Sequence, residues 1–299
     1  MPRKRKARPE PDNPDHEQAT TEGGAHVDAG MKGNDCREED GDEADNDNGC
    51  VQHFNIPFDN KSIVCERRGG KEGDEKLSLI FTHGAGGGIT SPATKDFADG
   101  FAEVGDIVTF KGAMNLQSRV KTYRAVTEYL DFDPAPALGG RSMGARAAAI
   151  CATAIHEEDR DRDRKTTKTK TKALVLVSFP LVGAKNKDSR EQILLDIPAG
   201  IDVLFITGTR DSMCDAEHLA EVAVRMKASC WFVQVRDADH GMAWKGKDSS
   251  EVMRRKTGAI AAGWLAEEGR DATKRYGSVS WDEDAEDIDW SGWRENNEK

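Results

Sequence analysis

The sequence predicts an α/β protein built on a mostly parallel, doubly wound sheet. Short apolar runs rich in β-branched residues recur between Leu77 and Ala266, as in strands that are buried on both faces. Helical patterns fill the intervals between these runs. Because strands and helices alternate along the chain, we expect a parallel sheet with helices on both of its faces.

The strands are expected in the apolar runs, with a hairpin before them. Residues 54–58 and 62–65 alternate apolar and polar side chains around Asp59-Asn60, which indicates an antiparallel hairpin. The buried strands that follow are expected at residues 77–81, 106–110, 136–138, 173–177, 203–206 and 230–235.

The helices are expected between these runs, and several have recognisable caps. Ser91 and Pro92 suit the N-cap and first position of a helix that extends to about residue 103. Asp215 and Ser250 suit the N-caps of two later helices. Further helices are expected at residues 117–130 and 143–155, and the second of these is apolar nearly all round, which suits a centrally packed helix.

Charged segments flank and interrupt this pattern. Residues 1–50 and 270–299 carry −7 and −4 of the chain's net charge of −11, and we expect both to be disordered acidic tails. Trp281, Trp290 and Trp293 in the second tail either fold back onto the domain surface, which we favour, or dock a partner. The domain between the tails, residues 51–269, is formally neutral, and we expect residues 156–172 to be a charged surface insertion in it.

Composition argues against several classes of function. The net charge of −11 argues against a mainly electrostatic nucleic-acid binder, and no apolar run approaches the ~18 residues of a membrane helix. The six cysteines show no paired spacing, and the chain starts with a basic cluster at residues 3–8 rather than a signal peptide. We therefore expect free thiols and a cytoplasmic or nuclear protein that is not secreted. The basic cluster is either a nuclear localisation signal or a solvated group of charges.

The turn after residues 136–138 has the pattern of a nucleophilic serine. It reads G-x-S-x-G through Gly140, Ser142 and Gly144, between an expected strand and an expected apolar helix. A nucleophilic serine on a sharp strand-to-helix turn has a strained backbone and needs small neighbours. The helix then directs its N-terminal N–H groups at the charge that develops on the substrate oxygen. Ser142 is therefore the candidate nucleophile.

A glycine-rich loop upstream, residues 84–88, offers the second half of an oxyanion hole. One of its backbone N–H groups would act together with the N–H group of Met143. The loop lacks the Lys-Ser/Thr of a P-loop and the G-x-G-x-x-G pattern of a dinucleotide site, so we discount nucleotide binding and expect no cofactor and no metal. His83 precedes the nucleophile in the chain and is expected to shape this loop rather than act as a base.

An acid and a base are expected after Ser142 in the chain, in that order. Asp211 and His240 each follow an expected strand, and the C-terminal ends of parallel strands share one edge, so the three side chains should converge. His240 would take the Ser142 proton and later return it, while Asp211 would hold the imidazole tautomer and stabilise its cation. Asp239 adjoins the histidine and is poorly placed as the acid, and Asp215 is better explained as a helix cap.

At these residues the sequence resembles the α/β-hydrolase superfamily. It more narrowly resembles the family of testis-expressed protein 30 and the hydrolase-like domain of subunit 3 of the NSL histone-acetyltransferase complex. The resemblance spans about residues 51–268. Its motifs are THGAGGG at 82–88, FKG at 110–112 with Arg119 after it, GGRSMGARAA at 139–148, SFPL at 178–181, TGTRDSMC at 207–214 and DADHGMAWKG at 237–246.

The resemblance implies a nucleophile at Ser142, an acid at Asp211 and a base at His240. It also implies oxyanion donors on the backbone of Ala85 and Met143. Gly84 and Gly86 lie beside Ala85 in the same loop and would help to bind substrate.

The segment in which related enzymes often insert a lid is short here. Only about 20 residues, 179–199, follow the expected strand at 173–177. This predicts little or no lid and an open site for short or exposed esters, thioesters or peptides. Preferential turnover of long-chain acyl esters would contradict it.

Two functions remain open from the sequence. One is a serine hydrolase that cleaves an acyl bond in an unidentified small-molecule or acylated substrate. The other is a non-catalytic, α/β-hydrolase-like scaffold, chromatin-associated like its NSL relative, that binds proteins through its tails. Neither requires direct contact with nucleic acid or a membrane. The complete Ser-His-Asp set favours the hydrolase.

Overall fold

The computed structural model describes residues 51–69, 76–161, 170–185, 188–244, 246–267 and 270–295. The expected N-terminal tail, residues 1–50, lies outside the described residues together with its basic cluster. The centre of the expected insertion, residues 162–169, also lies outside them.

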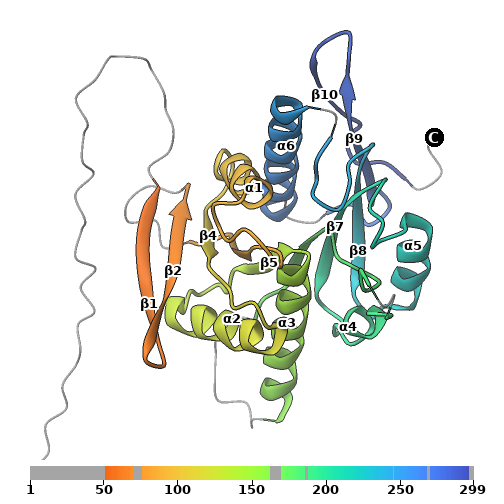
Figure 1. Cartoon of the computed structure of the whole chain (residues 1–299). Helices are drawn as coiled ribbons and strands as arrows, with labels where there is room; N and C mark the ends of the chain where they lie inside the picture. Colours follow the sequence, from red (N-terminus) through yellow and green to blue (C-terminus); the bar gives the residue numbers. More distant parts are fainter. Residues whose placement is uncertain are drawn as a thin grey trace, which may run out of the picture. The chain divides into compact units, whose positions relative to one another are not determined.

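Strands and helices alternate along the described part of the chain (Figure 1). In chain order they are β1 (Gln52–Phe58), β2 (Lys61–Arg68), β3 (Leu79–Thr82), α1 (Pro92–Ala102), β4 (Ile107–Phe110), α2 (Leu116–Leu130), β5 (Ala137–Arg141), α3 (Met143–Asp161), β6 (Ala173–Val177), α4 (Glu191–Leu195), β7 (Asp202–Gly208), α5 (Ala216–Arg225), β8 (Ser229–Val235), α6 (Lys247–Ala266), β9 (Tyr276–Asp282) and β10 (Asp287–Trp290).

The strands form one sheet in the order β1-β2-β4-β3-β5-β6-β7-β8-β9-β10. All neighbours from β4 to β9 in this order are parallel, whereas β2 is antiparallel to β4, β1 to β2 and β10 to β9. The winding direction reverses between β3 and β5, because the chain passes from β3 to β4 on one side and returns to β5 on the other. Such a reversal opens a crevice at the carboxyl ends of the strands. The predicted fold class is confirmed.

Helices cover both faces of the sheet (Figure 1). The helices α1 and α6 pack on one face, and α2, α3, α4 and α5 pack on the other. This explains why every residue of β3, β4 and β6 is buried. The first half of α3 is rich in alanine, and small side chains let this helix lie close to the strands that carry the nucleophile.

The first hairpin and most helix caps lie where the sequence predicted them. β1 and β2 pair around Asp59, and the Asp215 carboxylate accepts the His218 N–H group at 2.9 Å to cap α5. The expectation for Ser250 was wrong. The helix α6 begins one turn earlier, with Gly246 as its N-cap, and the Ser250 hydroxyl instead accepts the Trp244 N–H group at 2.8 Å.

The charged insertion begins later than predicted. Instead of ending near residue 155, α3 continues to Asp161. An ion pair between Arg124 on α2 and Glu158 on α3 attaches this charged end of the helix to its neighbour. Just before β6, Thr171 is buried and its hydroxyl donates to the Pro136 carbonyl at 2.7 Å, so this residue packs against the domain.

Within the described residues 270–295, the C-terminal segment is not a disordered tail, which corrects the prediction for that part of residues 270–299. The strand β9 pairs with β8, β10 pairs with β9, and Val279 is fully buried. As favoured from the sequence, Trp281, Trp290 and Trp293 pack against the core beside α6. The strands escaped prediction because the acidic residues that dominate this segment lie in the exposed turn and on the outer side of β10.

The connection between β6 and β7 is short, as predicted. Its described residues, 178–185 and 188–201, contain one helix, α4, which is five residues long. The carboxyl edge of the sheet is therefore covered by little chain at this point.

The cysteines of the described residues are unpaired. Cys65, Cys151, Cys214 and Cys230 are all buried, and burial raises the pKa of each thiol to about 12, which leaves them unreactive at neutral pH. None of the helices in the described ranges has the length and apolar content to cross a bilayer.

Ending the chain after Lys274 should destabilise the whole domain. The strand β8 then loses β9, its neighbour on one side, and the tryptophans that pack beside α6 are removed. We expect the free energy of unfolding in urea to fall by roughly 3 kcal/mol or more. A chain ending after Glu295 keeps both strands and is the control. Equal unfolding midpoints for the two chains would show that β9 and β10 contribute nothing to the fold.

Candidate active site

The three residues predicted to form a triad meet at the carboxyl edge of the sheet. Ser142 follows β5, Asp211 follows β7 and His240 follows β8. The Ser142 hydroxyl lies 2.9 Å from His240 Nε2, and His240 Nδ1 lies 2.8 Å and 3.0 Å from the two carboxylate oxygens of Asp211. A hydrogen-bonded chain therefore connects the serine to the carboxylate through the imidazole.

Ser142 occupies a strained turn. Its φ of 52° is in the left-handed region, which a non-glycine residue adopts at a cost of about 1–3 kcal/mol. A Cβ atom at Gly140 would lie 2.4 Å from the Gly144 backbone, and one at Gly144 would lie 2.3 Å from the Thr82 carbonyl oxygen. Both glycines of the motif are therefore required by close packing, and the turn is held by a hydrogen bond from Ser142 N–H to the Val177 carbonyl at 2.9 Å.

Asp211 is placed to fix the histidine tautomer. Its carboxylate is fully buried and also accepts the Met213 N–H group at 2.8 Å. An ionised carboxylate is only an acceptor, so His240 must carry its proton on Nδ1 and present a free lone pair on Nε2 to Ser142. Asp239 plays a different part, since it accepts the N–H groups of Gly241 and Ala243 and shapes the turn.

The predicted oxyanion residues flank the serine. Met143 is the first residue of α3, so its N–H group has no partner within the helix. The loop after β3 passes close to the nucleophile, because a Cβ atom on Gly84 would lie 3.5 Å from the Ser142 Cβ. Gly84 is buried, whereas Ala85 and Gly86 are exposed and open to a ligand. The assignment of the backbone N–H groups of Ala85 and Met143 as oxyanion donors stays a prediction.

Arg119 on α2 holds the loop after β3 through backbone carbonyl groups, a role that we did not predict from the sequence. Its side chain is fully buried and donates to the carbonyl groups of His83, Gly84 and Ala113, the last two at 2.9 Å and 2.7 Å. Burial lowers the pKa of Arg119 to about 10, which still leaves it charged at neutral pH. The sequence offered two signals for this role: Arg119 lies on an otherwise buried helix face, and it follows the FKG motif at 110–112.

His83 is a structural residue, in keeping with its expected role. Gly112 N–H donates to His83 Nε2 at 3.0 Å, so the proton is on Nδ1, which donates to the Gly84 carbonyl at 2.7 Å. Burial, followed by the charge of Arg119, lowers the pKa of His83 to about 4. The neutral imidazole therefore links the loop after β3 to the turn after β4.

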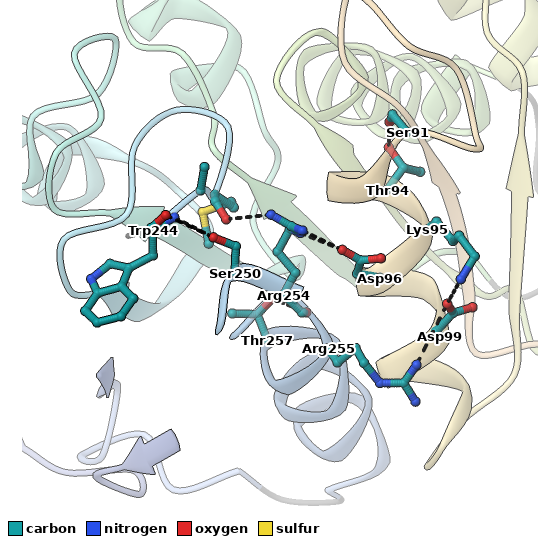
Figure 2. A network of polar contacts seen from close by, with 12 residues as sticks. Ser91, Thr94, Lys95, Asp96, Asp99, Trp244, Ser250, Arg254, Arg255 and Thr257 are labelled. Carbon is teal, nitrogen blue, oxygen red and sulfur yellow. Dashed lines mark hydrogen bonds and ion pairs between the residues drawn. The ribbon is translucent and has the colours of Figure 1, made fainter. Parts of the chain in front are cut away.

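A second group of contacts holds the loop that carries His240. Arg141, next to the nucleophile, donates to the His240 carbonyl. Arg254 on α6 donates to the Met242 carbonyl at 3.3 Å and pairs with Asp96 on α1 at 2.7 Å (Figure 2). Figure 2 also shows Ser250 bonded to the backbone of Trp244 at the far end of the loop. The loop is thus attached to β5, α1 and α6.

A serine hydroxyl, an imidazole and a buried carboxylate meet at the edge of the sheet and are linked by hydrogen bonds. They are the side chains that the sequence predicts as nucleophile, base and acid. The described ranges hold no group of three or more His, Cys, Asp or Glu side chains arranged to bind a metal ion.

Residues 75–263 match a protein family described as an alpha/beta hydrolase domain. Solved structures with the same fold include Est1E from Butyrivibrio proteoclasticus, with a TM-score of 0.54 and 17% identity over 72% of this chain and 99% of that one. Esterase 2 from Thermogutta terrifontis matches with a TM-score of 0.54 and 20% identity over 75% of this chain and 95% of the other. An alpha-beta serine hydrolase homologue from Coxiella burnetii matches at 0.51 and 17%, over 70% and 96%.

Removing both charges of the Arg254–Asp96 pair should loosen the loop after β8. In the double variant Arg254→Met with Asp96→Leu no buried charge is left unpaired, but the Met242 carbonyl loses its donor. We expect hydrogen exchange of the amides at 240–244 to accelerate by about ten-fold or more. The control is Arg255→Met, which removes ion pairs on the outer side of α6. Unchanged protection in the double variant would mean that the pair does not hold the loop.

Acid should destabilise the fold through His83. Its pKa of about 4 in the folded protein lies below the ordinary value of 6.5, so between these values the unfolded chain binds more protons. The contribution of neutral His83 to the free energy of unfolding is fully present above about pH 6.5. It is lost as the pH falls toward 4, by up to about 1.4 kcal/mol per pH unit. Urea unfolding at several pH values should show a steeper acid loss in the wild type than in His83→Gln. Parallel profiles would contradict this.

Proposed function

Because the chain belongs to the alpha/beta hydrolase domain family, we propose that it is a serine hydrolase that cleaves an acyl bond through Ser142, His240 and Asp211. The observation that carries this proposal is the unbroken hydrogen-bonded chain from Ser142 through His240 to Asp211, at 2.9 Å and 2.8 Å. The similarity to solved esterases supports the fold in which such chemistry is set.

In this proposal Ser142 Oγ attacks the substrate carbonyl carbon while His240 Nε2 takes its proton. The carbonyl oxygen becomes an oxyanion and accepts the N–H groups of Ala85 and Met143. His240 then gives the proton to the leaving group, and an acyl ester remains on Ser142. Water, deprotonated by His240, hydrolyses this ester and returns the serine. Asp211 stabilises the imidazolium in both halves of the reaction.

The small connection between β6 and β7 bears on the substrate class. The described residues of this connection form one short helix, α4, and no large cover over the site, which favours short or exposed acyl groups in esters, thioesters or peptides. The GRSMG and DSMC motifs further suggest kinship with testis-expressed protein 30 and the hydrolase-like domain of NSL subunit 3.

A non-catalytic scaffold is the second candidate, and one of the two observations in its favour, a free C-terminal tail, no longer holds. It relied on free tails, but the tryptophans of the C-terminal segment pack against the core beside α6. A scaffold also has no use for a strained serine at φ 52° beside a histidine and a buried carboxylate.

A fluorophosphonate probe should label the wild-type protein between about pH 6 and 9 and should not label Ser142→Ala. Asp211→Asn should label more than about 100-fold more slowly, because the imidazole then takes the wrong tautomer. The esterase from Thermogutta terrifontis is phosphorylated by paraoxon, so organophosphate chemistry is a fair probe of this fold. A folded wild-type protein that takes no label at any pH in this range would refute the proposal.

A further inference from the structure

Two arginines near the site differ from those that hold its loops. Arg119, Arg141 and Arg254 all donate to backbone carbonyl groups. By contrast, the half-buried guanidinium of Arg146 makes no hydrogen bond or ion pair with any part of the chain that the structure describes, and its Nε is buried without a partner. The Nε of Arg190 is also buried without a hydrogen bond.

The two guanidinium groups share one carboxylate, that of Asp188, and are only partly neutralised by it. Burial lowers the pKa of Arg146 most, the charge of Arg190 lowers it further, and the charge of Asp188 raises it. The carboxylate recorded beside Arg190 is Asp188, at 3.5 Å, and its side chain is 61% exposed. Glu191 is already engaged by His218 and Arg225. Two guanidinium groups beside one largely exposed carboxylate leave a net positive charge, which a further anion would offset.

This pair borders the catalytic residues. Arg146 lies in the first turn of α3, and its N–H group donates to the Ser142 carbonyl at 3.2 Å. Helical side chains lean toward the N-terminus, so Arg146 leans toward the end of α3 at which Ser142 lies and shares a face with Met143. Figure 1 draws α4, which Arg190 precedes, next to α3.

The backbone connects Arg190 to the triad from the other side. Arg190 N–H donates to the Leu181 carbonyl at 2.8 Å, and the adjacent Val182 N–H donates to the Met213 carbonyl at 3.1 Å. Met213 N–H in turn donates to the carboxylate of Asp211. The segment that carries Arg190 is thus held against the loop of the triad acid.

We propose that Arg146 and Arg190 form an anion subsite of the active site, and that the substrate is a short acyl compound bearing a carboxylate or phosphate group. The proposal rests on the proposed function, since it names the substrate class of the same site. The anion would accept hydrogen bonds from both guanidinium groups roughly one helical turn, ~5 Å, from the scissile carbonyl. A glutarate half-ester has suitable length.

Binding can be measured without turnover. In full-length Ser142→Ala, calorimetry should show that monomethyl glutarate binds at least about ten-fold more tightly than dimethyl glutarate. Adding Arg146→Gln or Arg190→Gln should remove this difference, whereas Arg255→Gln on the opposite face of the sheet should not. Arg146→Lys, which keeps the charge, should retain part of it and guards against a folding defect. If inorganic phosphate and not the half-ester binds in an Arg146-dependent way, the group is a phosphate. If neither anion binds in that way, the subsite is refuted.

Turnover separates the subsite from the proposed function. With the wild type, kcat/KM for the p-nitrophenyl half-ester of glutarate should exceed that for p-nitrophenyl methyl glutarate by about ten-fold, and Arg146→Gln should abolish this ratio. Equal hydrolysis of both esters without Arg146-dependent binding would overturn the subsite and leave the hydrolase intact. Arg146-dependent binding with no hydrolysis and no labelling of Ser142 would support the subsite and overturn the hydrolase.

Discussion

Buried arginines that donate to backbone carbonyl groups are the constraint on which the candidate site depends. The loops after β3 and β8 carry Ala85 and His240, and buried arginines donate to backbone carbonyl groups in both loops. A buried carbonyl without a donor costs about 1–3 kcal/mol, and a guanidinium offers five donors in a fixed fork. Arg119 serves the first loop, while Arg141 and Arg254 serve the second. Only Arg254 has a buried carboxylate as its partner, Asp96.

The strained serine turn depends on the same rigid surroundings. A left-handed φ at Ser142 persists only when neighbouring elements over-determine it. Here β6 accepts the Ser142 N–H group, α3 begins directly after it, and Gly144 lies against the end of β3. The serine, the imidazole and the carboxylate are therefore each fixed by backbone contacts as well as by one another, which is the preorganisation that acyl transfer requires.

Many acidic residues of the chain lie at the edge of the fold, away from the candidate site. The strand β10, which forms a hairpin with β9, is one of the two edge strands of the sheet, and its Asp287 and Asp289 are exposed. Charged residues on an edge strand discourage pairing with other chains. The tryptophans of the same hairpin face inward and cover α6. Near the nucleophile, by contrast, Arg146 and Arg190 outweigh Asp188, so the net charge of −11 is no guide to the substrate.

The sequence alone determined the parallel sheet, the serine turn and the order of acid and base, because apolar runs and the G-x-S-x-G pattern are local and a parallel sheet brings strand ends to one edge. Only the tertiary structure showed that Arg119, Arg141 and Arg254 hold loops through their backbone carbonyl groups. Hydrophobic periodicity indicates which residues are buried, but it does not indicate which carbonyl group accepts a hydrogen bond from a buried guanidinium. The tertiary structure also decided that residues 276–282 and 287–290 are strands, because their acidic side chains concealed a pattern that pairing with neighbouring strands stabilises. The start of α6 at Lys247 and the end of α3 at Asp161 depended likewise on contacts made after folding.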